Sequence, residues 1–90
     1  MSISASDEFR EWLFSLPPQP KRRIRLALRK LEKGKGDVKP LQGPLEGFCR
    51  LRVGGMRILF RYVGPHDIRL EYGNTRDVVY EMFQQFMERE

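Results

Sequence analysis

The stretch FCRLRVGGMRILFRY, residues 48–62, decides the fold because it reads as a β-hairpin with two very different faces. Two strand-like runs flank Gly54 and Gly55, and glycine reaches the positive φ that type I′ and II′ hairpin turns require. A two-residue turn at this place sets Arg52 opposite Arg57 and fixes every other pair in the hairpin. The register therefore predicts which side chains share a face.

Side chains alternate between the two faces of a strand. One face of the hairpin is predicted to be apolar, and it carries Cys49, Leu51, Val53, Met56, Ile58 and Phe60. The other face carries Phe48, Arg50, Arg52, Arg57, Leu59 and Arg61. Like charges opposite each other destabilise a sheet, so this second face indicates an anion-binding surface, the alternative being a face that arginine merely keeps soluble. We expect Phe48 and Leu59 to be exposed apolar groups on it.

The middle of the chain is much more basic than its net charge of +5 suggests. Residues 21–61 contain thirteen lysines and arginines against three acids, a local balance of +10. Such a segment favours a polyanionic partner: nucleic acid, an acidic protein or a membrane surface. No apolar run reaches the ~20 residues of a membrane span, and no signal segment is recognised. The single cysteine, Cys49, is expected to be a small core residue and is typical of a reducing compartment.

Two helices are predicted before the hairpin. Ser6, Asp7 and Glu8 are typical of a helix start, and the helix over residues 8–16 has its apolar residues at the spacing of one buried face: Phe9, Trp12, Leu13 and Leu16. Prolines at 17, 18 and 20 separate it from a helix over residues 21–33, whose inward residues are Ile24, Ala27, Leu28 and Leu31. Another side of this helix carries Arg22, Arg25 and Arg29. Residues 1–5 are compatible with a short edge strand.

Residues 38–47 are turn-rich, and a third strand is predicted over residues 67–72, with Ile68, Leu70 and Tyr72 on one face. Residues 73–75 read as a break before a helix over 76–90, whose apolar stripe is Val79, Met82, Phe83 and Phe86. The sequence therefore predicts one α+β domain over residues 1–90. Its predicted elements are an N-terminal helical hairpin, a β-hairpin, a third strand and a C-terminal helix.

Several chemistries find no support in the sequence. One histidine, one cysteine and no carboxylate cluster at ligand spacing predict no metal site, and no cofactor is expected. His66 and Asp67 lie in a predicted turn, which is a poor setting for a Ser-His-Asp triad. What remains is arginine with tyrosine, which binds phosphate and stabilises charge developing on it. This suits phosphodiester binding, or metal-free cleavage of RNA in which the 2′-hydroxyl is the nucleophile.

The segments PLQGPLEGFCRLRVGGMRILFRY (40–62) and IRLEYGNTRDVVYEMF (68–83) resemble the RelE/ParE-type toxins of bacterial type II toxin–antitoxin systems. The shared pattern is a leucine-x-glycine turn, an Arg-x-Arg strand, a glycine hairpin and an arginine opening the next strand. A glycine, a basic residue and a tyrosine follow. The resemblance covers about residues 38–83. It implies an α+β fold in which the N-terminal helical hairpin packs on a small, twisted, antiparallel-rich sheet and a helix follows at the C-terminus. It also implies a cytoplasmic toxin held inactive by a cognate antitoxin.

The resemblance also implies residue roles. Arg57 would stabilise the scissile phosphate, and Tyr80 would stack on a base or assist proton transfer. Arg76 would be the third catalytic residue, although it stands one position beyond the expected site at Thr75. The remaining RNA-binding candidates are Arg50, Arg52, Arg61, Arg22, Arg25 and Arg29. Arg50 and Arg52 replace a lysine pair of the best-known member, and arginine stays protonated in proteins, so they are interpreted as phosphate anchors and the general base stays unassigned.

Two classes of function follow from this resemblance. The first is a ribosome-dependent, metal-free mRNA endonuclease, with the ribosome, mRNA and an antitoxin as partners and with neither a membrane nor a small-molecule substrate. The second is a ParE-like toxin that inhibits DNA gyrase without catalysis. A weakened solitary homologue is a third possibility. The presence of Arg57, Arg76 and Tyr80 together favours the nuclease, because a gyrase-binding protein has no chemical need for them.

Overall fold

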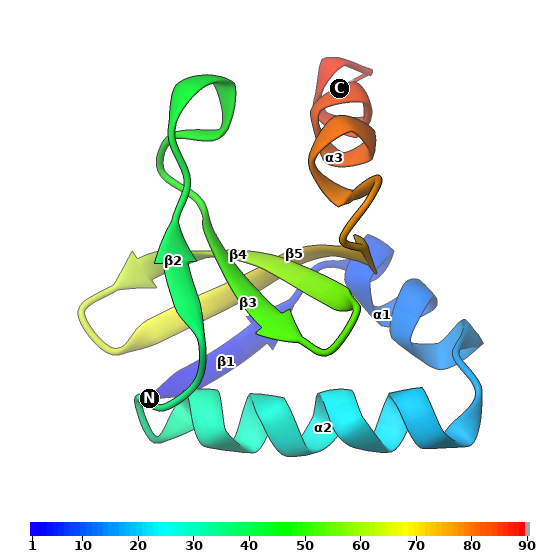
Figure 1. The fold of residues 1–90 in the computed structure, drawn as a ribbon. Helices are drawn as coiled ribbons and strands as arrows, with labels where there is room; N and C mark the ends of the chain where they lie inside the picture. The colour runs from blue at the N-terminus through cyan, green and yellow to red at the C-terminus, as the bar shows by residue number, and fades with distance from the viewer. Residues whose placement is uncertain (90) are drawn as a thin grey trace.

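A computed structural model describes residues 1–89 of the chain (Figure 1). In chain order the elements are β1 (Ser2–Ala5), α1 (Asp7–Ser15), α2 (Pro18–Glu32), β2 (Val38–Pro40), the 3₁₀ turn η1 (Gly43–Leu45), β3 (Cys49–Val53), β4 (Met56–Gly64), β5 (Asp67–Thr75) and α3 (Val79–Glu88). The strands form one five-stranded sheet in the order β1-β5-β4-β3-β2. β1 runs parallel to β5 and all other neighbours are antiparallel, so the α+β, antiparallel-rich prediction is confirmed.

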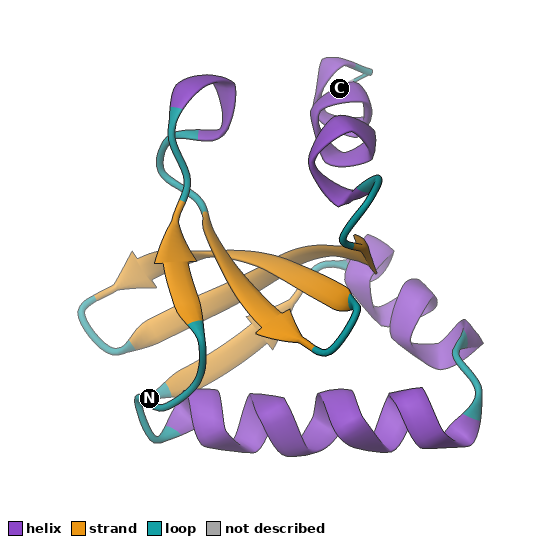
Figure 2. Cartoon of the chain, in the orientation of Figure 1, coloured by secondary structure: helices purple, strands orange, loops and turns teal. Residues whose placement is uncertain are grey.

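The helices cover the sheet from both sides. In Figure 2, α2 lies across one face of the sheet, whereas α3 and the η1 turn rise from the opposite face. Residues of α1 and α2 pack into one hydrophobic cluster with the apolar face of the hairpin, and residues of α3 and η1 form a second cluster on the other face. Below, the first is called the helical-hairpin face and the second the α3 face.

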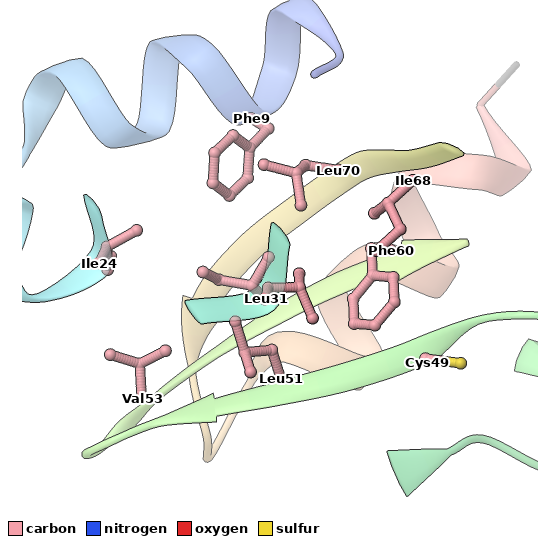
Figure 3. Close-up of a cluster of buried hydrophobic side chains, with 10 residues drawn as sticks. Phe9, Ile24, Leu31, Cys49, Leu51, Val53, Phe60, Ile68 and Leu70 are labelled. Atoms are coloured by element: carbon pink, nitrogen blue, oxygen red, sulfur yellow. The ribbon is translucent and has the colours of Figure 1, made fainter. Parts of the chain in front are cut away.

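The predicted hairpin register is confirmed pair by pair. Arg52 lies opposite Arg57, and Leu51 lies opposite Ile58. Gly54 has a φ of 59° and Gly55 is not in the positive-φ region, the pattern of a type II′ turn. Figure 3 shows the apolar face of the hairpin pointing into the cluster that α1 and α2 cover, where Phe9, Ile24, Leu31, Leu51 and Phe60 meet. Burial in this cluster raises the pKa of the Cys49 thiol, consistent with a core role.

The helical hairpin forms as expected, with one shifted boundary. Ser6 caps α1, its hydroxyl accepting the Phe9 amide at 3.1 Å. α2 begins at Pro18 and not at residue 21 as predicted. The first turn of a helix has no intrahelical partner for its N–H groups, so Pro18 and Pro20 fit there without loss of a hydrogen bond. The prolines thus start the second helix as well as ending the first.

The expectation that Phe48 and Leu59 are exposed is wrong. Leu59 has no exposed surface and lies in the second cluster, which consists of Leu45, Leu59, Tyr72, Val79 and Phe83. Phe48 is half-buried and packs edge-to-face on Phe83, with ring centroids 5.0 Å apart. α3 therefore covers the middle of the face on which the sequence predicted a continuous anion-binding surface.

Tyr72 lies on the opposite face of the sheet from the one predicted. A β-bulge interrupts the β4–β5 pairing, since Phe60 pairs with Leu70 and the next residue, Leu59, pairs with Tyr72. Glu71 is the extra residue on β5. Because one inserted residue reverses the alternation, Leu70 points into the first cluster and Tyr72 into the second.

Two further boundaries differ from prediction. β5 continues through residues 73–75, which were predicted to be a break, and α3 begins only at Val79. The turn-rich segment 38–47 contains the edge strand β2, which pairs with β3. In α3, Val79 and Phe83 are buried as expected, whereas Met82 is exposed, because the helix contacts the sheet along a narrower stripe than predicted.

The close approach of α1 to β5 depends on the absence of a side chain at Gly73. A Cβ atom added there would overlap the ring of Trp12. We expect Gly73→Ala to lower the free energy of unfolding by about 1–3 kcal/mol, the usual cost of overpacking a core, as measured by urea denaturation. Gly55→Ala is the matched control, since a Cβ at Gly55 meets no atom within 4 Å and its φ is not positive. An equal loss in both variants would contradict the packing explanation.

Candidate anion-binding face

The predicted arginines of the hairpin share the α3 face, but the covered centre divides them into separate places. Arg52 and Arg57 lie at the Gly54-Gly55 end of the hairpin, opposite each other. Arg50 lies beside the edge strand β2, and Arg61 lies on β4 beyond Leu59, opposite Arg69. Leu59, between these positions, is buried under α3. The face is therefore a rim of cations around an apolar centre.

The first place is the hairpin end, which brings two of the predicted catalytic residues together. Arg57 Nη1 donates to the carbonyl oxygens of Gly54 and Met56, at 2.8 and 2.9 Å. The backbone N–H of Arg76 donates to Gly55 O at 3.0 Å, which holds the residue after β5 against the same turn. These bonds use one terminal nitrogen of Arg57, and a guanidinium has five N–H donors. Its Nε and Nη2 groups can bind an anion while Nη1 fixes the side chain.

The second place is a groove of about 350 Å³ that contains the third predicted catalytic residue. Its lining consists of Lys39, Pro40, Leu41, Gln42, Arg50 and Tyr80. Tyr80 comes from the first turn of α3 and is half-buried. Below, this site is called the Tyr80 groove. It groups Tyr80 with Arg50 and Lys39, whereas Arg57 and Arg76 are not among its lining residues.

Carboxylates hold several of the predicted RNA-binding arginines. Arg50 Nη1 lies 3.0 Å from the Asp37 carboxylate and 2.9 Å from its backbone oxygen, and only 17% of the arginine side chain is exposed. These contacts fix Arg50 at the wall of the Tyr80 groove. Such a fixed cation loses little side-chain entropy when it binds an anion.

A second carboxylate lies between two arginines at the far end of the face. Glu71, the bulge residue, accepts from Arg61 Nε at 2.5 Å and lies 3.6 Å from Arg69 Nε. Its side chain is 17% exposed, so its charge is poorly screened by water. Glu71 thus offsets part of the charge of Arg61 and Arg69. Within residues 1–89, by contrast, neither Arg52 nor Arg57 forms an ion pair.

The remaining RNA-binding candidates lie on the other side of the molecule. Arg22, Arg25 and Arg29 line a groove of about 530 Å³ on α2, together with Pro18, Lys21 and Leu26. α2 covers the helical-hairpin face and α3 rises from the opposite face (Figure 1), so these arginines lie across the sheet from the helix that carries Tyr80. One continuous RNA strand on the α3 face would not reach them.

Sequence reasoning missed Lys39, Gln42 and Asn74. Lys39 lies on β2, opposite Arg50 of β3. The prolines of segment 38–47 favoured turns, so β2 was not predicted. Asn74 lies opposite Arg57, at a position that was predicted to be a break. The alternation of Val38 and Lys39 was the available signal for β2, but three residues are too few to distinguish a strand from a turn.

The described residues hold neither a cluster of metal ligands nor a helix that could cross a membrane. No group of three or more histidine, cysteine, aspartate or glutamate side chains is placed to hold a metal ion in residues 1–89. Over the same range, every helix is too short or too polar to cross a membrane.

Comparison with known proteins identifies the fold. The sequence matches no protein-family model and no curated protein. Solved structures do match in shape. A chain of the RelB–RelE antitoxin–toxin complex from Methanococcus jannaschii has a TM-score of 0.69 at 24% identity, over 89% of this chain and 98% of that one.

Two other toxin structures agree. YafQ from E. coli strain BL21(DE3) has a TM-score of 0.69 at 15% identity, over 86% of this chain and 94% of that one. A chain of the YoeB–YefM complex from Staphylococcus aureus has a TM-score of 0.66 at 15% identity, over 84% and 97% respectively. The fold that the sequence resemblance implied is therefore present.

Removal of the Glu71 charge is expected to release two arginines for anion binding. For the binding of a single-stranded RNA, the logarithm of the association constant falls linearly with the logarithm of the salt concentration. In Glu71→Gln the slope of this line should become more negative by up to ~1.4, for two added phosphate contacts. The free energy of unfolding should fall by about 1–3 kcal/mol, because a charge-assisted bond is lost. Fluorescence anisotropy over a salt series and urea denaturation measure the two effects.

Asp77→Asn is the matched control. It removes the same charge from the Arg76–Asp77 pair, whose side chains are 64% and 82% exposed. Exposed pairs contribute little, so its stability should change by less than about 1 kcal/mol. An unchanged salt dependence in Glu71→Gln would mean that Arg61 and Arg69 lie outside the RNA path.

Proposed function

From the fold of the RelE-type toxins, which this chain shares, we propose that the protein is the toxin of a type II toxin–antitoxin system. We further propose that it acts in the cytoplasm as a ribosome-dependent endonuclease that cleaves mRNA. The observation that carries this proposal is the cation rim of the α3 face, where Arg57 has donors directed to no carboxylate of residues 1–89 and Tyr80 lines a groove with Arg50.

Arg57 is proposed to stabilise the phosphate in the transition state. Its Nη1 bonds to the hairpin turn fix the guanidinium before substrate arrives. A preorganised donor of this kind acts on the charge that develops as phosphorus becomes pentacovalent. Arg76, held at the same turn, adds a second cation, and Arg52 anchors a neighbouring phosphate.

The reaction needs no group from outside the RNA as nucleophile. The 2′-oxygen forms a bond to phosphorus and loses its proton to solvent, and the bond from phosphorus to the 5′-oxygen breaks. The 5′-oxygen takes its proton from solvent, and Tyr80, in a separate groove from Arg57, stacks on a neighbouring base. The products are a 2′,3′-cyclic phosphate and a 5′-hydroxyl. Arg50, fixed by Asp37 at the wall of the Tyr80 groove, anchors the RNA backbone.

If the protein is a nuclease, loss of Arg57 and loss of an arginine on α2 should have different effects. Arg57→Ala should lower the cleavage rate of translated mRNA ~10²–10³-fold, with a smaller effect on ribosome binding, because the lost donor acts mainly in the transition state. Arg57→Lys should restore activity only in part, since lysine lacks the planar fork. Primer extension on a translated message measures the rates, with Tyr80→Phe in parallel.

Arg22→Ala is the control for this experiment. Its side chain lines the groove on α2, which contains none of the proposed catalytic residues, so Arg22→Ala should weaken ribosome association in a salt-dependent way and leave the cleavage step unchanged. If wild-type protein leaves translated mRNA intact but inhibits supercoiling by gyrase, the ParE-like alternative is correct and the nuclease proposal fails.

The proposed partner is an antitoxin that covers part of the α3 face. The chains similar in fold include RelE and YoeB, whose structures were solved as complexes with RelB and YefM. The acidic residues of such a segment would match the cation rim. Its apolar residues would match Phe48, Phe86 and Met87 in the groove between α3 and α1, whose own acids disfavour further carboxylates there.

Co-expression tests this partnership. Expression of the toxin alone should stop growth, and expression with the short protein encoded beside it should restore growth and give a complex that elutes together in size-exclusion chromatography. A chain that is harmless alone and binds no such protein would favour the solitary-homologue alternative.

A further inference from the structure

We propose that the corner between α1 and α2 is a stacking site for an unpaired base of a folded RNA, with Phe14 as the stacking platform and the arginines of α2 as the phosphate contacts. This goes beyond the proposed function, since binding of a folded RNA needs no cleavage. It also assigns a residue, Phe14, that neither the nuclease reaction nor the core uses.

Phe14 is exposed to an unusual extent. It lies near the end of α1 with 83% of its surface exposed, the highest value among the exposed large hydrophobic residues of the described chain. The opposite side of α1 carries Phe9 and Trp12 into the core. Exposure of an aromatic ring gains nothing for folding, because the hydrophobic effect rewards only buried surface. A ring in this position is available for a planar ligand.

A cation already lies over this ring. Lys21 Nζ is 5.0 Å from the centroid of Phe14, within the range of a cation–π contact. Lys21 also lines the groove on α2, whose other lining residues are Pro18, Arg22, Arg25, Leu26 and Arg29. Lys21 therefore joins the aromatic platform and the arginines into one continuous surface.

The charge of this surface selects a polyanion. Four of the six lining residues are cations and none is an acid. The three acids of α1, Asp7, Glu8 and Glu11, line a different groove, beside α3. From Arg22 to Arg29 the helix rises about 10 Å, which is roughly the axial length of three nucleotides of a duplex strand at 3.4 Å each.

The same surface suits RNA better than an acidic peptide. An amphipathic acidic helix would need a continuous apolar groove for its own apolar residues, whereas the groove on α2 contains only Leu26 and Pro18 as apolar residues. A single exposed ring beside a row of arginines is the arrangement that stacks one base and binds its flanking phosphates. A base in the interior of a duplex has both faces covered by the neighbouring pairs, so a base that stacks on Phe14 comes from a loop or a bulge.

The test compares two labelled RNAs with the full-length protein. One is a hairpin with an unpaired loop, and the other is a duplex with the same number of phosphates and no loop. We expect Phe14→Ala to weaken binding of the hairpin roughly 5- to 100-fold, the usual effect of removing one stacking aromatic, and to leave duplex binding unchanged. Phe14→Trp should retain hairpin binding. Arg25→Ala should weaken both RNAs and lower the salt dependence.

Val63→Ala is the matched control, because Val63 is also an exposed apolar residue but lies beside the β4–β5 turn. It should change neither affinity. The proposal is wrong if Phe14→Ala leaves hairpin binding unchanged, weakens both RNAs equally, or weakens only the antitoxin complex. These outcomes do not depend on cleavage of translated mRNA, so the nuclease proposal can stand or fall separately.

Discussion

The burial of three consecutive residues on β4 is the constraint on which the rest of the molecule depends. Ile58, Leu59 and Phe60 have no exposed surface, with Ile58 and Phe60 in one cluster and Leu59 in the other. A strand buried on both faces cannot carry charge at its centre, because an unpaired buried charge is very costly. The arginines of β4, Arg57 and Arg61, therefore stand on either side of this buried segment. The position of the cation rim is a consequence of a doubly covered sheet.

Two carboxylates then determine what each arginine can do. Asp37 fixes Arg50, and Glu71 occupies Arg61 and Arg69. Arg57 is fixed differently, by neutral carbonyl oxygens, so its position is set while its charge is not cancelled. The distinction matters for chemistry, since a cation that is both fixed and uncompensated stabilises a developing negative charge with little reorganisation. Arginines on the same sheet thus differ in how well they can stabilise a negative charge.

Sequence patterns correctly predicted the features that depend on neighbouring residues. The hairpin register followed from Gly54-Gly55 and the alternation around it, and the inward face of α2 followed from the spacing of Ile24, Ala27, Leu28 and Leu31. What failed depended on distant parts of the chain. The exposure of Leu59 could not be judged without knowing that α3 folds back over it. The face of Tyr72 depended on a bulge at Glu71, and no feature of the sequence there distinguishes an inserted residue from a regular strand. The Tyr80 groove needed β2, which is too short to give a pattern.

The pairing of β1 with β5 has a consequence for the timing of folding. Ser6, at the start of α1, donates its backbone N–H to Leu70 O and its hydroxyl to Glu71 O, so the N-terminal segment is bound by residues made more than sixty positions later. Contacts of such separation form late, because the chain between them must first be closed into a loop. During synthesis from the N-terminus, β1 therefore has no strand to pair with until β5 has left the ribosome. α3 with Tyr80 emerges after β5, so the Tyr80 groove is complete only when α3 has joined β2 and β3.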